Sequence, residues 1–195
     1  MAQVLKEDVK QRIYDAAVEE FYEKDYKTAT IRDIAGRAEV PVGLVYSYYE
    51  SKEDLFYAIV EPIATNMDNL MKTEESRVEE KRNADPFDNL RRIVTDSIFN
   101  SIDNPKSLVV LMDKSFGTRY QDFKDSIIRR MELHMKTVVS DQKIQYDSLL
   151  FHIWASSLIE GICEIIRHYK GKKWAEQMLE LVAKHYCYGI NAFLQ

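Results

Sequence analysis

The sequence predicts an all-α fold. Apolar residues recur at three- and four-residue spacing along most of the 195 residues, which is typical of amphipathic helices. No segment of useful length alternates apolar and polar residues as a half-buried strand does, and no repeat of fixed period is present. Capping residues before short apolar runs, the Asp-Pro and Asn-Pro pairs, and Gly117 and Gly171 mark helix starts and stops, so we expect roughly eight to ten helices and no sheet.

The composition is that of an ordered globular chain, with 46% hydrophobic and 30% charged residues. No glycine-rich phosphate-binding motif occurs among the six glycines, which counts against nucleotide-binding enzyme folds. Cys163 and Cys187 form no C-x-x-C motif and no secretory segment precedes them, so we expect a reduced, cytoplasmic protein. The most apolar stretch, residues 149–166, contains His152, Glu160 and Glu164, and we therefore expect no association with a membrane.

Amphipathic spacing predicts a first helix over residues 6–23. Thr30 and Asp33 have the spacing of a capping box, which predicts a short helix from Thr30 to about Ala38. Pro41 suits the first turn of another helix, which we expect to end near Tyr49.

Ser51 and Asp54 repeat the capping-box spacing, so a longer helix is expected to start there and run toward Met71. The charged run over residues 72–85 is the best linker candidate. Asp85-Pro86 and Asn104-Pro105 predict helix starts. Residues 117–121 offer a glycine stop at Gly117 and then another capped helix start, and two long helices are expected over residues 145–169 and 173–193.

Two short capped helices joined by a tight turn, after an amphipathic helix, predict a helix-turn-helix unit. The stretch from Thr30 to Leu55, TIRDIAGRAEVPVGLVYSYYESKEDL, resembles the DNA-binding signature of the tetracycline-repressor (TetR) family of transcriptional regulators. Upstream, Ile13, Ala16, Ala17, Phe21 and Tyr26 are similar to the first helix of that family. The resemblance covers about residues 9–60 and implies a DNA-binding domain over residues 1–50, followed by an effector-binding and dimerisation domain over residues 51–195.

Three positions depart from the family pattern. Glu39 stands where the family usually has glycine in the turn, so we expect a strained residue at positive φ. Pro41 replaces a serine, which removes the side-chain cap of the recognition helix. Val42 and Leu44 replace the frequent lysine and threonine, so we expect base reading to depend on thymine methyl groups and DNA shape.

The resemblance implies a set of DNA-contacting residues, in which Lys52 and Tyr48 bind phosphate, Thr30 combines capping with phosphate binding, and Tyr46 packs inside the unit. The expected contacts are Thr30, Arg32, Val42, Gly43, Leu44, Ser47, Tyr48 and Lys52. Each of them has a simpler interpretation, and for Lys52 it is a solvated surface lysine. Residues 1–60 hold eight basic and twelve acidic side chains, a net charge of 8 − 12 = −4, which counts against tight nonspecific binding.

Aromatic, methionine and polar residues outside the motif are candidates for an effector pocket, although any one of them is more often ordinary core. These are Phe99, Met112, Phe116, Tyr120, Phe123, Met131, His134, Trp154, Ser157 and Glu160. The last two helices carry more apolar surface than one internal face uses, which predicts a homodimer interface. Its candidates are Phe151, Leu158, Ile162, Ile165, Ile166, Met178, Leu181, Val182 and Phe193.

The sequence thus predicts a repressor that binds a palindromic operator in double-stranded DNA as a homodimer and is released by a small, largely hydrophobic effector. We expect no cofactor, no metal site and no catalytic activity, because neither metal-ligand spacing nor a nucleophile arrangement is visible. The alternative is a helical small-molecule-binding or enzymatic bundle whose N-terminal unit does not bind DNA.

Overall fold

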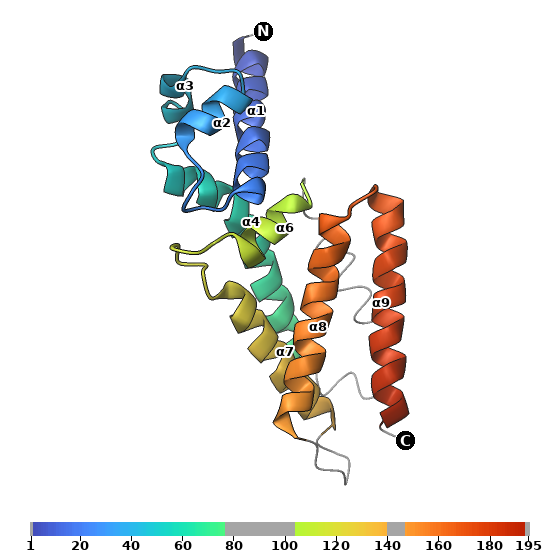
Figure 1. The fold of residues 1–195 in the computed structure, drawn as a ribbon. Coiled ribbons are helices and arrows are strands. Elements are labelled where there is room, and N and C mark those ends of the chain that lie inside the picture. The colour runs from blue at the N-terminus through green and yellow to red at the C-terminus, as the bar shows by residue number, and fades with distance from the viewer. Residues whose placement is uncertain (1, 77–103, 140–146, 194–195) are drawn as a thin grey trace. The chain divides into compact units, whose positions relative to one another are not determined.

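The computed structural model describes residues 2–76, 104–139 and 147–193 of the chain, and in these ranges it contains eight helices and no strand (Figure 1). The predicted all-α class is therefore confirmed. The helices are α1 (Ala2–Glu23), α2 (Ile31–Arg37), α3 (Val42–Tyr46), α4 (Lys52–Ser76), α6 (Lys106–Asp113), α7 (Phe123–Val139), α8 (Ser148–Arg167) and α9 (Lys172–Phe193).

The N-cap hydrogen bond of each expected capping box forms, while Asp33 and Asp54 accept from the Thr30 hydroxyl and the N–H of Glu50 instead of the N-cap N–H. The backbone N–H of Asp33 donates to Thr30 Oγ1 at 3.1 Å, and the N–H of Asp54 donates to Ser51 Oγ at 3.0 Å. Asn104 Oδ1 accepts from the N–H of Lys106 at 3.0 Å, so α6 begins beside the expected Asn-Pro pair. Local side-chain chemistry thus determines where these helices start.

Three expected boundaries are wrong. Helix α3 ends at Tyr46 instead of near Tyr49, with Ser47 as its C-cap. Helix α4 includes Pro62 and continues to Ser76, so the first five residues of the expected linker, 72–76, are helical. The turn that follows Gly117 runs to residue 122, and α7 begins only at Phe123. The remainder of the expected linker, residues 77–85, and the expected helix start at Asp85-Pro86 lie outside the described residues.

The described residues form two compact units. The N-terminal unit contains residues 2–65 and 104–122, and the C-terminal unit contains residues 66–76, 123–139 and 147–193. Helix α6 belongs to the N-terminal unit because it packs against α1, with Lys106 Nζ 2.5 Å from Glu19 Oε2. These units divide the chain differently from the expected functional boundary at residue 50, which stays a prediction.

The core of the N-terminal unit is built where α1, α2, α3 and α4 face one another. Phe21 and Phe56 pack edge to face with ring centroids 5.1 Å apart, and Tyr26 packs on Phe56 at 4.9 Å. Ile34 of α2 and Val45 of α3 are fully buried. Burial of Val45 fixes which side of the short helix α3 remains exposed.

The turn between α2 and α3 has the hydrogen bonds of a Schellman motif. The N–H of Val40 donates to the carbonyl of Ala35 at 3.0 Å, and the N–H of Glu39 donates to Gly36 at 3.2 Å. Glu39 has φ of 54°, which confirms the expected left-handed residue at a position where glycine is preferred. Arg12 of α1 reaches across the turn and donates to the carbonyls of Ala38 at 2.7 Å and Glu39 at 3.2 Å.

In the C-terminal unit, α8 packs against both α7 and α9. Its buried side chains are Phe151, Ala155, Leu158, Ile159, Ile162, Cys163, Ile165 and Ile166. By length and composition α8 is, among the described residues, long and apolar enough to cross a bilayer, and 44% of that stretch is buried. Two neighbouring helices thus account for the apolar character of α8.

Glu39→Gly should stabilise the chain by about 1 kcal/mol, because glycine adopts the left-handed conformation without the clash of a Cβ atom. Chemical denaturation measures the change in the free energy of unfolding. Glu39→Ala is the matched control, since it removes the carboxylate but keeps a Cβ at positive φ. Equal stabilisation by both variants would show that charge, and not backbone strain, limits stability at this turn.

Candidate nucleic-acid interface

Helix α3 presents an exposed surface made of Val42, Gly43 and Tyr46. Val42 is 40% exposed and Tyr46 is 52% exposed, and residues four apart lie on the same side of a helix. Gly43 has no heavy atom within 4 Å of the place where a Cβ would lie, so its backbone is open to solvent. Leu44 is half-buried. The expectation that Tyr46 packs inside the unit is wrong, because Val45 and Tyr49 occupy the buried side instead.

The helix has no side-chain cap at its start, as the sequence predicts from Pro41. Tyr49 lies directly behind the exposed surface, and burial raises the pKa of its phenol to about 12. Tyr49 is therefore a core residue of the unit, while the side chains on the outer side of α3 are left for a ligand.

The hydroxyl groups beside α3 are engaged inside the unit. Thr30 Oγ1 donates to Asp33 Oδ2 at 2.8 Å, and Ser47 Oγ donates to the carbonyl of Gly43 at 3.1 Å. The Tyr48 hydroxyl donates to the carbonyl of Lys6 at 3.1 Å. Each of these three predicted DNA contacts thus has a structural partner in the chain without DNA.

Lys52, at the first position of α4, fastens the loop between α1 and α2. Its ammonium donates to the carbonyls of Tyr26 at 2.7 Å and Ala29 at 3.0 Å, with Lys27 at the 3.5 Å limit. The ammonium also lies 4.6 Å from the centroid of the Tyr26 ring. Lys52 is therefore an anchor for this loop, a role that the sequence did not indicate.

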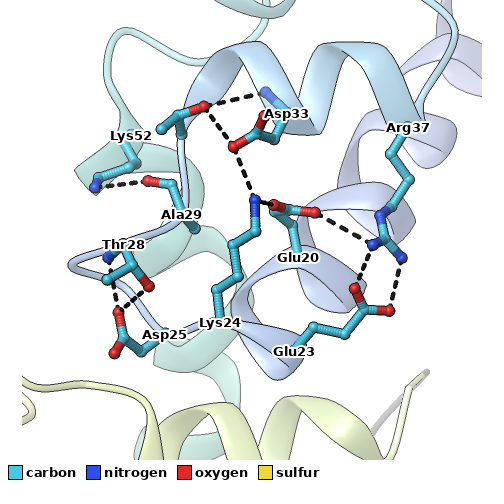
Figure 2. Close-up of polar contacts among 10 residues, drawn as sticks. Glu20, Glu23, Lys24, Asp25, Thr28, Ala29, Asp33, Arg37 and Lys52 are labelled. Atoms are coloured by element: carbon cyan, nitrogen blue, oxygen red, sulfur yellow. Dashed lines mark hydrogen bonds and ion pairs between the residues drawn. The ribbon is translucent and has the colours of Figure 1, made fainter.

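An ion-pair network joins the end of α1 to α2, as Figure 2 shows. Lys24 Nζ lies between Glu20 Oε1 at 2.5 Å and Asp33 Oδ2 at 2.9 Å. The Lys24–Glu20 contact is an ion pair without the alignment of a hydrogen bond. Arg37 Nη2 lies 3.3 Å from Glu20 and 2.5 Å from Glu23. Glu20 is only 3% exposed, and two cations compensate its charge.

The network shifts the titration of its members. The hydrogen bond from Lys24 lowers the pKa of Asp33, and that from Arg37 lowers the pKa of Glu23. The carboxylates of Glu20 and Asp33 in turn raise the pKa of Lys24. In the adjoining loop, the N–H of Thr28 donates to Asp25 and lowers the pKa of that carboxyl group. All of these shifts favour the charged forms near neutral pH.

Two residues of this unit were missed as positioning residues. Arg12 binds the turn before α3, and Glu20 is a buried acid beside the start of α2. Periodicity does signal Glu20, because it lies four and three residues after Ala16 and Ala17 on the buried side of α1. Nothing local signals Arg12, since its partners lie 26 and 27 residues away. Arg32, a predicted contact, is exposed on α2.

The residues expected to line an effector pocket are divided between the two units. Met112, Phe116 and Tyr120 lie in the N-terminal unit, where Tyr120 packs on Tyr57 at 5.8 Å. Phe123, Met131, His134, Trp154, Ser157 and Glu160 lie in the C-terminal unit. Ion pairs with Lys124 at 2.6 Å and Arg167 at 2.5 Å lower the pKa of Glu160. Phe99 lies outside the described residues.

The residues expected at the dimer interface differ in exposure. Phe151, Leu158, Ile162, Ile165 and Ile166 are buried within the C-terminal unit and form its core. Met178 and Val182 are half-buried, while Leu181 is 60% exposed. The side chain of Phe193 lies outside the described part of the chain. The exposed apolar surface of α8 and α9 consists instead of Leu149, Ile153, Leu181 and Tyr188.

Lowering the pH should reduce the folding stability of the N-terminal unit, because protonation of Glu23 and Asp33 breaks ion pairs of this network. A carboxyl group whose pKa is lowered by folding stabilises the fold above its unfolded value, about 4, and loses that contribution as the pH falls through the folded value. We expect the melting temperature to fall below about pH 4. Asp33→Asn should lower the melting temperature at pH 7 and converge on the parent chain at pH 3.

Asp8→Asn is the matched control for that experiment, because it removes the same charge from an exposed position outside the network. It should keep the pH dependence of the parent chain. If Asp33→Asn gave a constant offset at every pH, the Lys24–Asp33 contact would not contribute to stability.

Comparisons with known proteins agree with this geometry. Residues 13–59 match the family model described as bacterial regulatory proteins of the tetR family. A transcriptional repressor of Mycobacterium tuberculosis, Rv3405c, is 33% identical over 69 residues, which cover 35% of this chain and 37% of the repressor. The regulator HbdR of Aromatoleum is 40% identical over 53 residues, which cover 27% of this chain and 23% of HbdR. The matched region spans well under half the length of either relative.

The likeness of fold extends further than the likeness of sequence. A TetR-like transcriptional regulator from Rhodococcus superimposes with a TM-score of 0.58 at 19% identity, covering 93% of this chain and 96% of that one. The family match and the shared fold agree: residues 13–59 match the tetR family of bacterial regulatory proteins, and the chain shares the all-α fold of a TetR-like regulator.

Proposed function

We propose that this chain is a transcriptional repressor that binds a palindromic DNA operator as a homodimer, with α3 in the major groove. The observation that carries the proposal is the exposed outer side of α3 within a unit that matches the family model over residues 13–59. The relatives named above are transcriptional regulators, and nothing favours the alternative of a ligand-binding or enzymatic bundle that does not bind DNA.

In this proposal the DNA contacts divide into two kinds. Val42, Gly43 and Leu44 face base edges, while Arg32 and Lys52 supply positive charge near phosphate groups. Thr30, Ser47 and Tyr48 complete the contact surface by exchanging an internal hydrogen bond for one to the DNA backbone. Anchoring the loop and attracting a phosphate are compatible roles for Lys52, because the carbonyl oxygens that it binds carry no net charge.

We assign the dimer interface to the exposed apolar side chains of α8 and α9. Leu181 is 60% exposed on α9, and Leu149 and Ile153 are exposed at the start of α8. Exposed apolar residues on two adjacent helices are a typical basis for a symmetric interface. A two-fold dimer would present two copies of α3 to the two halves of a palindrome.

We place a small, largely hydrophobic effector in the C-terminal unit, with Phe123, Met131 and Trp154 as apolar candidates and His134, Ser157 and Glu160 as polar ones. Such a ligand acts on DNA binding only through different affinities for two conformations of the dimer. By linkage it must then bind the DNA-free protein more tightly than the operator complex. The proposed protein works in the cytoplasm, where its DNA target lies.

Binding to DNA from the region upstream of the chain's own gene tests this function. Specific binding should exceed binding to random duplex by at least about a thousandfold. Lys52→Ala should lower the melting temperature, because carbonyls of the α1–α2 loop lose their donor, and should reduce the salt slope of binding by about one. Lys173→Ala removes one exposed charge from the C-terminal unit and should leave both quantities unchanged. An unchanged slope for Lys52→Ala would limit that residue to its anchoring role.

Leu181→Asp should dissociate the dimer, since a carboxylate at a covered apolar position loses its solvation. Analytical ultracentrifugation measures the mass, and operator affinity should fall with it. Leu133→Asp is the matched control because Leu133 is 66% exposed on α7, outside the proposed interface. Loss of dimer in both variants would contradict the assignment to α8 and α9.

A further inference from the structure

The outer side of α3 exposes apolar groups at Val42 and Gly43, and three hydroxyl side chains of the same unit already have internal partners. Val42 and the bare backbone of Gly43 are open to solvent, and Leu44 lies half-buried beside them. The hydroxyls of Thr30, Ser47 and Tyr48 donate to acceptors within the unit. At Val42 and Gly43 a base edge therefore meets methyl and methylene groups, beside the backbone amides of the first turn.

Four basic side chains of this unit are also bound within it, while Arg32 is exposed on α2. Arg12 holds the turn carbonyls, and Arg37 and Lys24 lie in the ion-pair network. Lys52 binds the carbonyls of the α1–α2 loop. The bidentate pairing of arginine or lysine with guanine, which is the commonest specific contact, has no donor on the exposed side of α3.

We infer that this chain recognises its operator through the C5-methyl groups of thymines, read by Val42 and the backbone of Gly43. The inference rests on the proposed function, since it requires α3 to enter the major groove. Of the groups that the four bases present there, only the thymine methyl is apolar. The open space at Gly43 lets the backbone of α3 approach that methyl group closely.

The Tyr46 ring extends the same surface by one helical turn. It is 52% exposed and lies on the same side of α3 as Val42. Its hydroxyl is neutral and can donate one hydrogen bond, to a phosphate or to a base, at the edge of the contact between α3 and DNA. Val42 and Gly43 have no side chain that can donate a hydrogen bond to a base. We therefore place the discrimination between DNA sequences at these two residues.

Replacement of thymine by deoxyuridine tests the inference, because it removes one methyl group and leaves every hydrogen-bonding group in place. Bound sequences are first selected from a random duplex pool with the full-length chain. Each thymine of the selected site is then replaced singly, and affinity is measured by fluorescence anisotropy at one salt concentration. For at least one thymine in each half-site we expect a loss of about fourfold, as one buried methyl group contributes.

Val42→Ala identifies the side chain involved. It removes two exposed methyl groups, and alanine is the better helix former, so the unit should still fold. At the thymine read by Val42, deoxyuridine should cost this variant less than about twofold, because the partner of the methyl group is gone. The matched control is Leu133→Ala on α7, which should keep the fourfold loss.

The outcomes separate the two claims. Specific binding with no thymine sensitive to deoxyuridine would overturn methyl recognition and leave the proposed function intact. An equal deoxyuridine loss in Val42→Ala and the parent chain would overturn the assignment to Val42. Failure to select any sequence, with the chain folded by circular dichroism, would overturn the proposed function and this inference with it.

Discussion

The placement of α3 depends on the backbone reversal at Glu39. A helix of five residues is too short to be stable alone, so its position must come from its connections and its contacts. Two contacts supply it: Val45 is fully buried in the unit, and Arg12 binds the carbonyls of Ala38 and Glu39. The long helix α1 thereby determines where the exposed side of α3 lies, although Glu39 adopts a conformation that suits glycine better.

The same unit binds much of its positive charge internally. Lys24 and Arg37 neutralise carboxylates of α1 and α2, and Lys52 neutralises no acid but holds carbonyl oxygens. With a net charge of −4 over residues 1–60, little cationic surface remains for counterion release from DNA. Under the proposed function, affinity then depends on close fit and base contacts more than in a strongly basic domain.

The C-terminal unit shows why an apolar helix is not by itself an interface. Helix α8 is apolar on most of its surface, which from sequence alone suggests a partner chain. In the structure α7 and α9 cover two of its sides, and Phe151, Leu158 and Ile162 lie inside the unit. Among the described side chains of these two helices, which end at residue 189, the exposed large apolar ones are Leu149 and Ile153 of α8 and Leu181 and Tyr188 of α9.

The sequence by itself determined the all-α class, the caps at Thr30 and Ser51, the left-handed residue at Glu39 and the family of the N-terminal unit. Each of these depends on residues within a few positions of one another, where spacing implies contact. Only the tertiary structure decided that Tyr46 is exposed, that Lys52 binds the α1–α2 loop and that most apolar residues of α8 are core while Leu149 and Ile153 are exposed. Those outcomes depend on partners more than 20 residues away, as the contacts of Arg12 and Lys52 show, and no local pattern specifies which distant group a side chain will meet.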